Sequence, residues 1–241
     1  MQQHHEHSNQ QHQQKTNVLV GDVEVLISSH QDSLNIKVCE KTGLNPKLLR
    51  SHEKIMHLII VSKDLEEFHH LHPAQLTENE FSVDVSLSNK EYVAFVDIKP
   101  EGMNYSIKPI PIVIEGRENP DIPSQSKLKK DINTTRELNG KIVELHSSPL
   151  VVGEDITFRF DLKNATPMPY LGALGHVVII DEKIQQFIHV HPLNEDKPIF
   201  VAHFKKAGLY KMWAEFILDN ELLAFPFVVQ VTNILMKQGI H

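Results

Sequence analysis

One 17-residue segment occurs twice in the chain, and this duplication constrains the fold more than any other feature. The first copy, residues 57–73, is HLIIVSKDLEEFHHLHP, and the second, residues 176–192, is HVVIIDEKIQQFIHVHP. They align without a gap at an offset of 119 residues, and both contain a histidine, twelve other residues and then His-x-His-Pro. A solenoid unit has roughly 20–50 residues, so this much longer period indicates two homologous domains of about 100 residues each.

The segments around the two copies are short and rich in β-branched and aromatic residues. Examples are residues 23–27 and 34–38 in the first half and 156–160 and 210–216 in the second. Turn residues separate them, and no stretch has long helical periodicity with caps. We therefore predict an all-β fold of two tandem immunoglobulin-like or cupredoxin-like β-sandwich domains that arose by internal duplication.

Composition divides the chain into five parts. Residues 1–16 are rich in Gln and His and have too few apolar residues to offset the entropy of ordering, so we expect a disordered tail. This tail is either a native segment that binds metal weakly or a purification tag. We expect β-sandwich domain 1 over 17–116, a linker over 117–133, β-sandwich domain 2 over 134–233 and a C-terminal tail over 234–241.

Bulk properties exclude several classes of partner. The net charge of −7 argues against nucleic acid, and no apolar run approaches the roughly 18 residues of a transmembrane segment. Cys39 is the only cysteine, so neither an internal disulfide nor a thiolate cluster can form. Polar residues follow Met1 without an apolar stretch, so we expect no signal peptide in this sequence. We expect either a cytosolic protein or an extracytoplasmic one whose export signal has been removed, and the polar tail ahead of a β domain favours the second.

The repeated motif predicts a hairpin that brings its histidines together. A turn at residues 63–66 would place Ile59 opposite His70 and His57 opposite His72, and opposed residues have Cβ atoms about 4.5–5.5 Å apart. Because residues two apart share a sheet face, the three imidazoles would meet at one end of the hairpin. The second copy predicts the same arrangement. We therefore expect one metal ion per domain, held by two separate trios: His57, His70 and His72, and His176, His189 and His191.

Neutral imidazoles suit Cu(II), Zn(II) and Ni(II), and divalent affinity peaks at copper, so we expect copper first and zinc second. Asp97 and Glu215 are the matched acids on a later strand, and either would complete the coordination sphere or hold a ligand histidine from outside it. Two alternatives remain. Three histidines with an open fourth position also form a catalytic zinc site, with one of these acids as general base. Histidines bonded only to main-chain oxygens would leave a structural module without metal.

The segment Tyr170-Leu-Gly-Ala-Leu-Gly-His176, followed by Phe187-Ile-His-Val-His-Pro192, resembles a family of bacterial exported or lipid-anchored proteins. Their hallmark is Tyr-Leu-Gly-Ala-x-Gly-His ahead of His-Val-His-Pro. The similarity is close over residues 165–216, whereas in the first half Ser51-His-Glu-Lys-Ile-Met replaces the glycine-containing lead. A more distant likeness is to the YtkA-like and cupredoxin-type β-sandwiches of copper trafficking. The resemblance implies extracytoplasmic copper handling, in trafficking, storage or resistance, with metal ions as ligands and a metal-accepting protein as partner.

Overall fold

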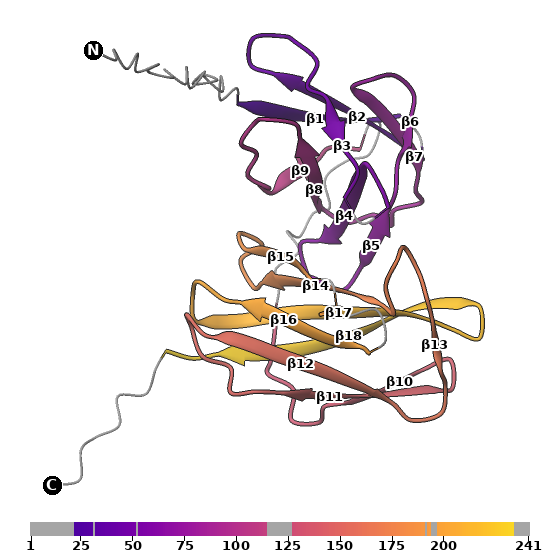
Figure 1. Cartoon of the computed structure of the whole chain (residues 1–241), viewed down its shortest axis with the longest axis vertical. Coiled ribbons are helices and arrows are strands. Elements are labelled where there is room, and N and C mark those ends of the chain that lie inside the picture. The colour runs from indigo at the N-terminus through magenta and orange to yellow at the C-terminus, as the bar shows by residue number, and fades with distance from the viewer. Residues whose placement is uncertain are drawn as a thin grey trace, which may run out of the picture.

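The computed structural model describes residues 22–30, 32–51, 53–114, 127–190, 192–193 and 197–233. Its regular elements are β-strands, which form two halves stacked along the long axis of the molecule (Figure 1). In the part of the chain that is described, no helix is long and apolar enough to cross a membrane. The predicted tails at 1–16 and 234–241, and residues 117–126 of the predicted linker, lie outside the described residues.

The first half, called domain 1 below, consists of two packed sheets. Its outer sheet has the strand order β1-β2-β7-β6, and its inner sheet has the order β3-β8-β4-β5, with β9 paired to β8. Apolar residues of both sheets form one buried core between them. The strands are β1 (Val23–His30), β2 (Ser33–Glu40), β3 (Leu48–Leu49), β4 (Met56–Ser62), β5 (Phe68–Leu71), β6 (Ala74–Gln75), β7 (Glu80–Asp84), β8 (Tyr92–Pro100) and β9 (Ile110–Ile112).

The second half, domain 2, repeats this plan. Its outer sheet has the order β10-β11-β12-β16, and its inner sheet has the order β13-β17-β14-β15, with β18 paired to β17. Because β14, β15 and β17 stand where β4, β5 and β8 stand in domain 1, the predicted pair of β-sandwiches from a duplication is confirmed. The strands are β10 (Thr135–Leu138), β11 (Lys141–Ser147), β12 (Asp155–Leu162), β13 (Pro167–Met168), β14 (His176–Asp181), β15 (Phe187–Val190), β16 (Ile199–His203), β17 (Gly208–Leu218) and β18 (Glu221–Val231).

Strand β4 is buried on both faces, and this explains how the domains meet. Alternate residues of a strand point to opposite faces. Leu58 and Ile60 pack in the core of domain 1, whereas Ile59 and Val61 belong to a separate apolar cluster. That cluster joins the two inner sheets, so the inner sheets face each other across the domain interface. Its buried members are Ile59, Val61, Leu65, Val93, Phe95, Leu128, Val178, Ile180, Ile184, Trp213 and Val228.

Two aromatic stacks in this interface are reciprocal. Phe68 of domain 1 stacks on Trp213 of domain 2 with ring centroids 4.7 Å apart, and Phe187 of domain 2 stacks on Phe95 of domain 1 at 4.9 Å. Phe68 and Phe187 hold the same place in the two motifs, and Phe95 and Trp213 hold matched places on β8 and β17. Equivalent residues of the two domains therefore make the same contact in both directions, which is the property of an isologous, two-fold interface.

The described end of the predicted linker packs on domain 2. Leu128 is only 9% exposed and lies in the interface cluster. The main-chain nitrogen of Asp131 donates to the Val228 carbonyl at 3.0 Å, and the Asp131 carboxylate accepts from the Val228 nitrogen at 2.7 Å. Residues 127–133 are thus fixed along β18 and contribute to the apolar contact between the domains.

Candidate metal centre

The two motif hairpins have the predicted registers. Ile59 lies opposite His70 in the β4–β5 pair, and Val178 lies opposite His189 in the β14–β15 pair. Leu65 and Ile184 hold equivalent turn positions and have positive φ angles of 59° and 56°. The repeated turn therefore sets the same register in both domains, and it directs the histidines of each motif toward the domain interface.

In domain 1 the three motif histidines meet as predicted from the hairpin geometry. Nδ1 of His57 lies 3.1 Å from Nε2 of His70 and 3.2 Å from Nε2 of His72. Two nitrogens bound to one tetrahedral ion at roughly 2.0–2.1 Å lie about 3.3 Å apart. Nδ1 of His57 is therefore close enough to share an ion with Nε2 of His70 or with Nε2 of His72.

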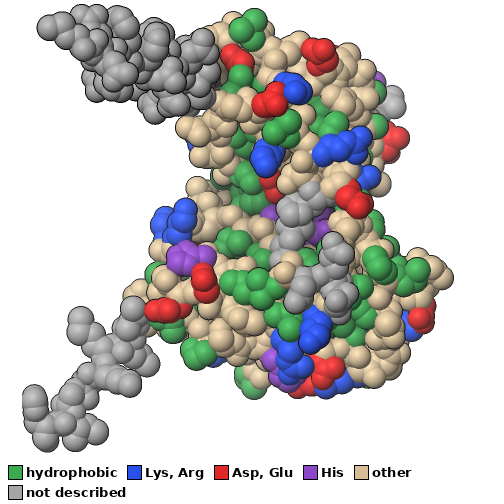
Figure 2. Space-filling model, viewed as in Figure 1, with side chains coloured by type: hydrophobic (Ala, Val, Ile, Leu, Met, Phe, Trp, Pro, Cys, Tyr) green, Lys and Arg blue, Asp and Glu red, His purple; other side chains and the backbone are tan. Residues whose placement is uncertain are grey.

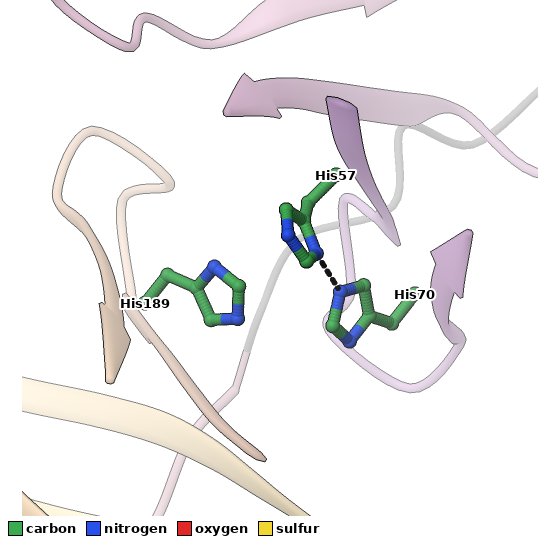
Figure 3. Close-up of side chains that lie close together, drawn as sticks. All are labelled: His57, His70 and His189. Carbon is green, nitrogen blue, oxygen red and sulfur yellow. Dashed lines mark hydrogen bonds between the residues drawn. The ribbon is translucent and has the colours of Figure 1, made fainter. Parts of the chain in front are cut away.

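Histidines of domain 2 join the same cluster, so the expectation of two separate sites requires correction. Figure 3 shows His189 reaching from the other domain toward His57 and His70, and one ligand atom of each lies within 4.8 Å of the others. The His176 ring centroid lies 5.8 Å from that of His70 and 6.0 Å from that of His189. His191 lies outside the described residues. The described histidines of both motifs thus meet at one interdomain centre, and Figure 2 shows histidine side chains at the waist of the molecule.

The ring spacings fit imidazoles around one ion. A ring that binds through nitrogen has its centroid about 3.2 Å from the ion, so two such rings in a tetrahedral site have centroids about 5.2 Å apart. The centroid of His57 lies 5.4 Å from that of His70, 4.9 Å from that of His72 and 5.0 Å from that of His189. His70 lies 4.9 Å from His72 and 5.2 Å from His189. The donor set and its spacing therefore suit a borderline transition metal.

The two predicted acids hold histidines of the opposite domain. Nδ1 of His70 donates to the Glu215 carboxylate at 2.5 Å, and Nδ1 of His189 donates to the Asp97 carboxylate at 3.0 Å. The side chains of His70 and His189 are 1% and 3% exposed. A carboxylate that accepts the Nδ1 proton leaves the lone pair on Nε2, which is the nitrogen that can bind a metal. Asp97 and Glu215 therefore orient the histidines from outside the cluster.

The other two histidines of the domain 1 trio also have oxygen partners on the ring nitrogens that face away from the cluster. Nε2 of His57 donates to the Ser51 carbonyl at 3.2 Å, which leaves the lone pair of His57 on Nδ1. Nδ1 of His72 lies 3.4 Å from the Tyr170 hydroxyl of domain 2. The nitrogens of His57 and His70 that face each other at 3.1 Å are consequently both acceptors, an arrangement that a cation between them would stabilise.

The protonation states of His72 and Tyr170 also favour metal binding at this centre. Burial, together with the neighbouring His70 and His57 and then the Lys54 ammonium, lowers the pKa of His72 from 6.5 to about 3. Burial, and to a smaller extent the Glu215 charge, raises the pKa of the Tyr170 phenol. His72 is therefore neutral at physiological pH, with a lone pair available, and Tyr170 keeps its proton.

The loops that precede the two motifs form the same turn from different sequences. Tyr170 N donates to the Ala173 carbonyl, and Ser51 N donates to the Lys54 carbonyl, both at 2.7 Å.

Tyr170 was not among the predicted site residues. Its only sequence signal is the Tyr-Leu-Gly-Ala-x-Gly-His motif, which indicates a tight turn but not a contact with a histidine of the other domain.

The same two loops touch each other at equivalent positions. Gly172 and Glu53 both have positive φ, 74° and 65°. A Cβ added to Gly172 would lie 3.4 Å from Oε1 of Glu53. Contact between equivalent residues is expected next to a two-fold axis, so this pair agrees with the reciprocal stacks and acid–histidine pairs.

A second group of potential ligands lies on the outer sheet of domain 2. Glu144, His146 and Asp161 on β11 and β12 have ligand atoms within 4.8 Å of one another. The ammonium of Lys163 lies 2.6 Å from a carboxylate oxygen of both Glu144 and Asp161. Because this ammonium already pairs with an oxygen of each acid and offsets part of their charge, the interdomain centre is the stronger candidate.

The fold and the centre define a class of protein: tandem β-sandwiches with a buried histidine cluster between them. A family model described as "Domain of unknown function (DUF8832)" matches residues 10–110 and 136–233, and the chain belongs to that family. No curated protein matches the chain. Among solved structures, the FN1-FN3 domains of chicken CNTN1 are 8% identical over 89% of this chain and 67% of that one. The TM-score of that likeness is 0.25.

Proposed function

We propose that the protein binds a transition metal ion between its two domains, with copper as the first choice and zinc as the second. The observation that carries this proposal is the convergence of His57, His70 and His189 from both domains, with ligand atoms within 4.8 Å of one another. The acceptors that face the outer ring nitrogens add support, because ligand histidines in metal sites almost always donate their second N–H to an oxygen.

The choice of metal follows from the donors. Imidazole nitrogens suit Cu(II) and Zn(II), and the divalent series favours copper over zinc for the same site. The cluster residues are imidazoles with carboxylates outside them, a set with little affinity for the hard ions Mg²⁺ and Ca²⁺, which prefer oxygen ligands. Copper and zinc are therefore the ions to test first.

Binding is favoured over catalysis by what surrounds the ligands. Glu215 and Asp97, the two candidate general bases, are each engaged with the Nδ1 proton of a histidine. The His57 and His70 side chains are each only 1% exposed. A buried centre whose carboxylates already have partners suits metal binding and transfer better than catalysis. We accordingly assign the protein to metal trafficking, storage or resistance, with a metal-accepting protein as its partner.

The proposed location is outside the cytoplasm, at the periplasm, the cell surface or a lipid anchor. This part of the proposal depends on the resemblance of the Tyr170–His176 lead and the His189–Pro192 segment to exported copper-associated proteins. Fractionation of the native host cells, followed by detection of the protein in each fraction, tests it. Recovery in the cytosol alone would contradict the proposed location.

Metal titration tests the proposed function. The full chain and a variant without residues 1–16 are stripped of metal, titrated with Cu(II) and Zn(II) by calorimetry, and then challenged with a chelator. We expect one ion to be retained by both proteins. A ligand present at 100 times its Kd should also stabilise the fold by about 2.7 kcal/mol, seen as a higher melting temperature. Stoichiometry near zero without the tail would refute a metal site between the domains.

A further inference from the structure

The approximate two-fold symmetry of the interface applies to its histidines as well. His70 and His189 hold equivalent places in the two motifs, and their ring centroids lie 5.2 Å apart. The rotation that exchanges them also exchanges His57 with His176. It therefore converts the trio His57, His70 and His189 into a second trio formed by His176, His189 and His70.

We propose that the centre holds a single ion in either of two overlapping positions. Both positions use His70 and His189, and they differ in whether the third ligand is His57 or His176. This inference rests on the proposed metal-binding function and adds how the ion is held and how it moves.

The ring spacings allow both positions, but not equally. The first trio has centroid separations of 5.4, 5.0 and 5.2 Å, close to the value of about 5.2 Å expected for a tetrahedral ion. In the second trio the His176 centroid is 5.8 Å from His70 and 6.0 Å from His189. A shift of the His176 ring by less than about 1 Å would close the second position. The first position is therefore already formed, and the second forms by a small side-chain movement.

The hydrogen bonds to the acids explain why one ion, and not two, occupies the centre. His70 and His189 each donate Nδ1–H to a carboxylate, so each presents only Nε2 to an ion. One nitrogen lone pair binds one ion. Because both positions need Nε2 of His70 and of His189, filling one position excludes the other.

Both positions are buried, since His57 is 1% exposed and His176 is 0% exposed, and His57 has an additional histidine beside it. His57 in the first position contacts His72, which is partly exposed, with their facing nitrogens 3.2 Å apart. His176 in the second position is completely buried. An ion that enters beside His72 would reach the first position, and exchange of His57 for His176 would move it to the second position while two ligands stay attached. The ion would thus move between the two positions without leaving the centre.

Three variants test the overlap: His57→Ala, His176→Ala and the double variant, all in the full chain. Cu(II) affinity is measured by chelator competition, and coordination by electron paramagnetic resonance at one equivalent of Cu(II). If two exclusive positions contribute to binding, the observed association constant is the sum of two constants, and each single variant retains one of them. The two single-variant affinities, each as a fraction of wild type, should therefore sum to about one. The double variant should lose the buried ion.

Each single variant should also give one Cu(II) spectrum, and the wild-type spectrum should be a weighted sum of the two. Large losses in both single variants would mean that His57 and His176 bind the ion together, which overturns the overlap but not metal binding. Two tightly held ions in wild type, or full affinity in His176→Ala with none in His57→Ala, would also overturn it. No retained ion in wild type would refute the proposed function itself. Circular dichroism of the metal-free variants verifies folding, and His57→Gln and His176→Gln replace any alanine variant that fails to fold.

Discussion

Glu215 accepts a hydrogen bond from Nδ1 of His70 at 2.5 Å across the domain interface, and both side chains are almost completely buried. Asp97 and His189 repeat this contact in the opposite direction at 3.0 Å. Each domain therefore supplies the acid that orients a histidine of its partner. Neither domain alone contains a complete centre, so metal affinity and the packing of the two domains should change together.

Replacement of His70 by alanine should abolish retention of the ion. His70 contacts His57 and Glu215, and its loss also leaves the Glu215 carboxylate buried without this donor, which costs about 3–5 kcal/mol. Chelator competition measures the affinity, and urea unfolding measures the stability. His69→Ala is the matched control, because His69 is the next residue of β5 and points to the other face. Equal retention by the two variants would exclude His70 as a ligand.

Removing the charge of Glu215 should weaken metal binding without removing a ligand. Glu215→Gln leaves an oxygen that can accept from His70, but it makes the histidine a poorer donor to the metal. Loss of such an outer partner typically lowers affinity by about 10–100-fold. Asp97→Asn should have a smaller effect, because the Asp97 side chain is 28% exposed and water screens its charge. Glu154→Gln, an exposed acid on domain 2, is the control and should leave the affinity unchanged.

The register of the motif hairpins was predictable from sequence, but the packing of the two inner sheets against each other was not. Alternation along β4 and β5 and the position of the turn place His57, His70 and His72 together, because strand periodicity is a local property. Which sheet faces another domain depends on surfaces that are distant in sequence. One signal was present: β4 reads MHLIIVS, apolar on both faces, and such a strand must be covered on both sides. Tyr170 was missed for the same reason, since its partner His72 is in the other domain.

Acidification should destabilise the metal-free protein. Burial, followed by the neighbouring histidines, lowers the pKa of His72 to about 3 in the folded chain, whereas an unfolded chain binds the proton near pH 6.5. The unfolded state therefore takes up more protons between these values. The His72 ring therefore does not reduce the free energy of unfolding above about pH 6.5, but it reduces that free energy progressively as the pH drops toward 3.

Urea unfolding of the metal-free protein at several pH values between 7.5 and 4.5 measures this effect. His72→Gln has no titrating ring at this position, so its stability should fall less steeply than that of wild type over the same range. Parallel curves for the two proteins would show that His72 is not responsible.

The aromatic stacks should connect the domain interface with the metal centre. Phe68→Ala removes the ring that stacks on Trp213 at 4.7 Å and should lower the free energy of unfolding by about 3 kcal/mol. Trp213 is the only tryptophan, so a red shift of its emission reports exposure of the interface. Copper affinity should fall as well, because the domains lose alignment. Phe204→Leu, in the core of domain 2, should reduce stability without changing the emission or the affinity.

Gly175 should be essential for placing both Tyr170 and Glu215. Its φ is 144°, and an added Cβ would lie 2.6 Å from the Phe216 ring and 2.7 Å from the Glu215 carbonyl. Gly175→Ala must therefore move β17, which carries Glu215, away from the loop that carries Tyr170. We expect both a lower melting temperature and a lower affinity for copper. Gly153→Ala is the matched control: its φ is 83° and no atom lies within 4 Å of the added Cβ, so it introduces backbone strain alone. Gly153→Ala should lose some stability, by about 1 kcal/mol, and keep the affinity of wild type. If Gly175→Ala binds copper as tightly as Gly153→Ala does, the close packing of this loop on β17 does not position the centre.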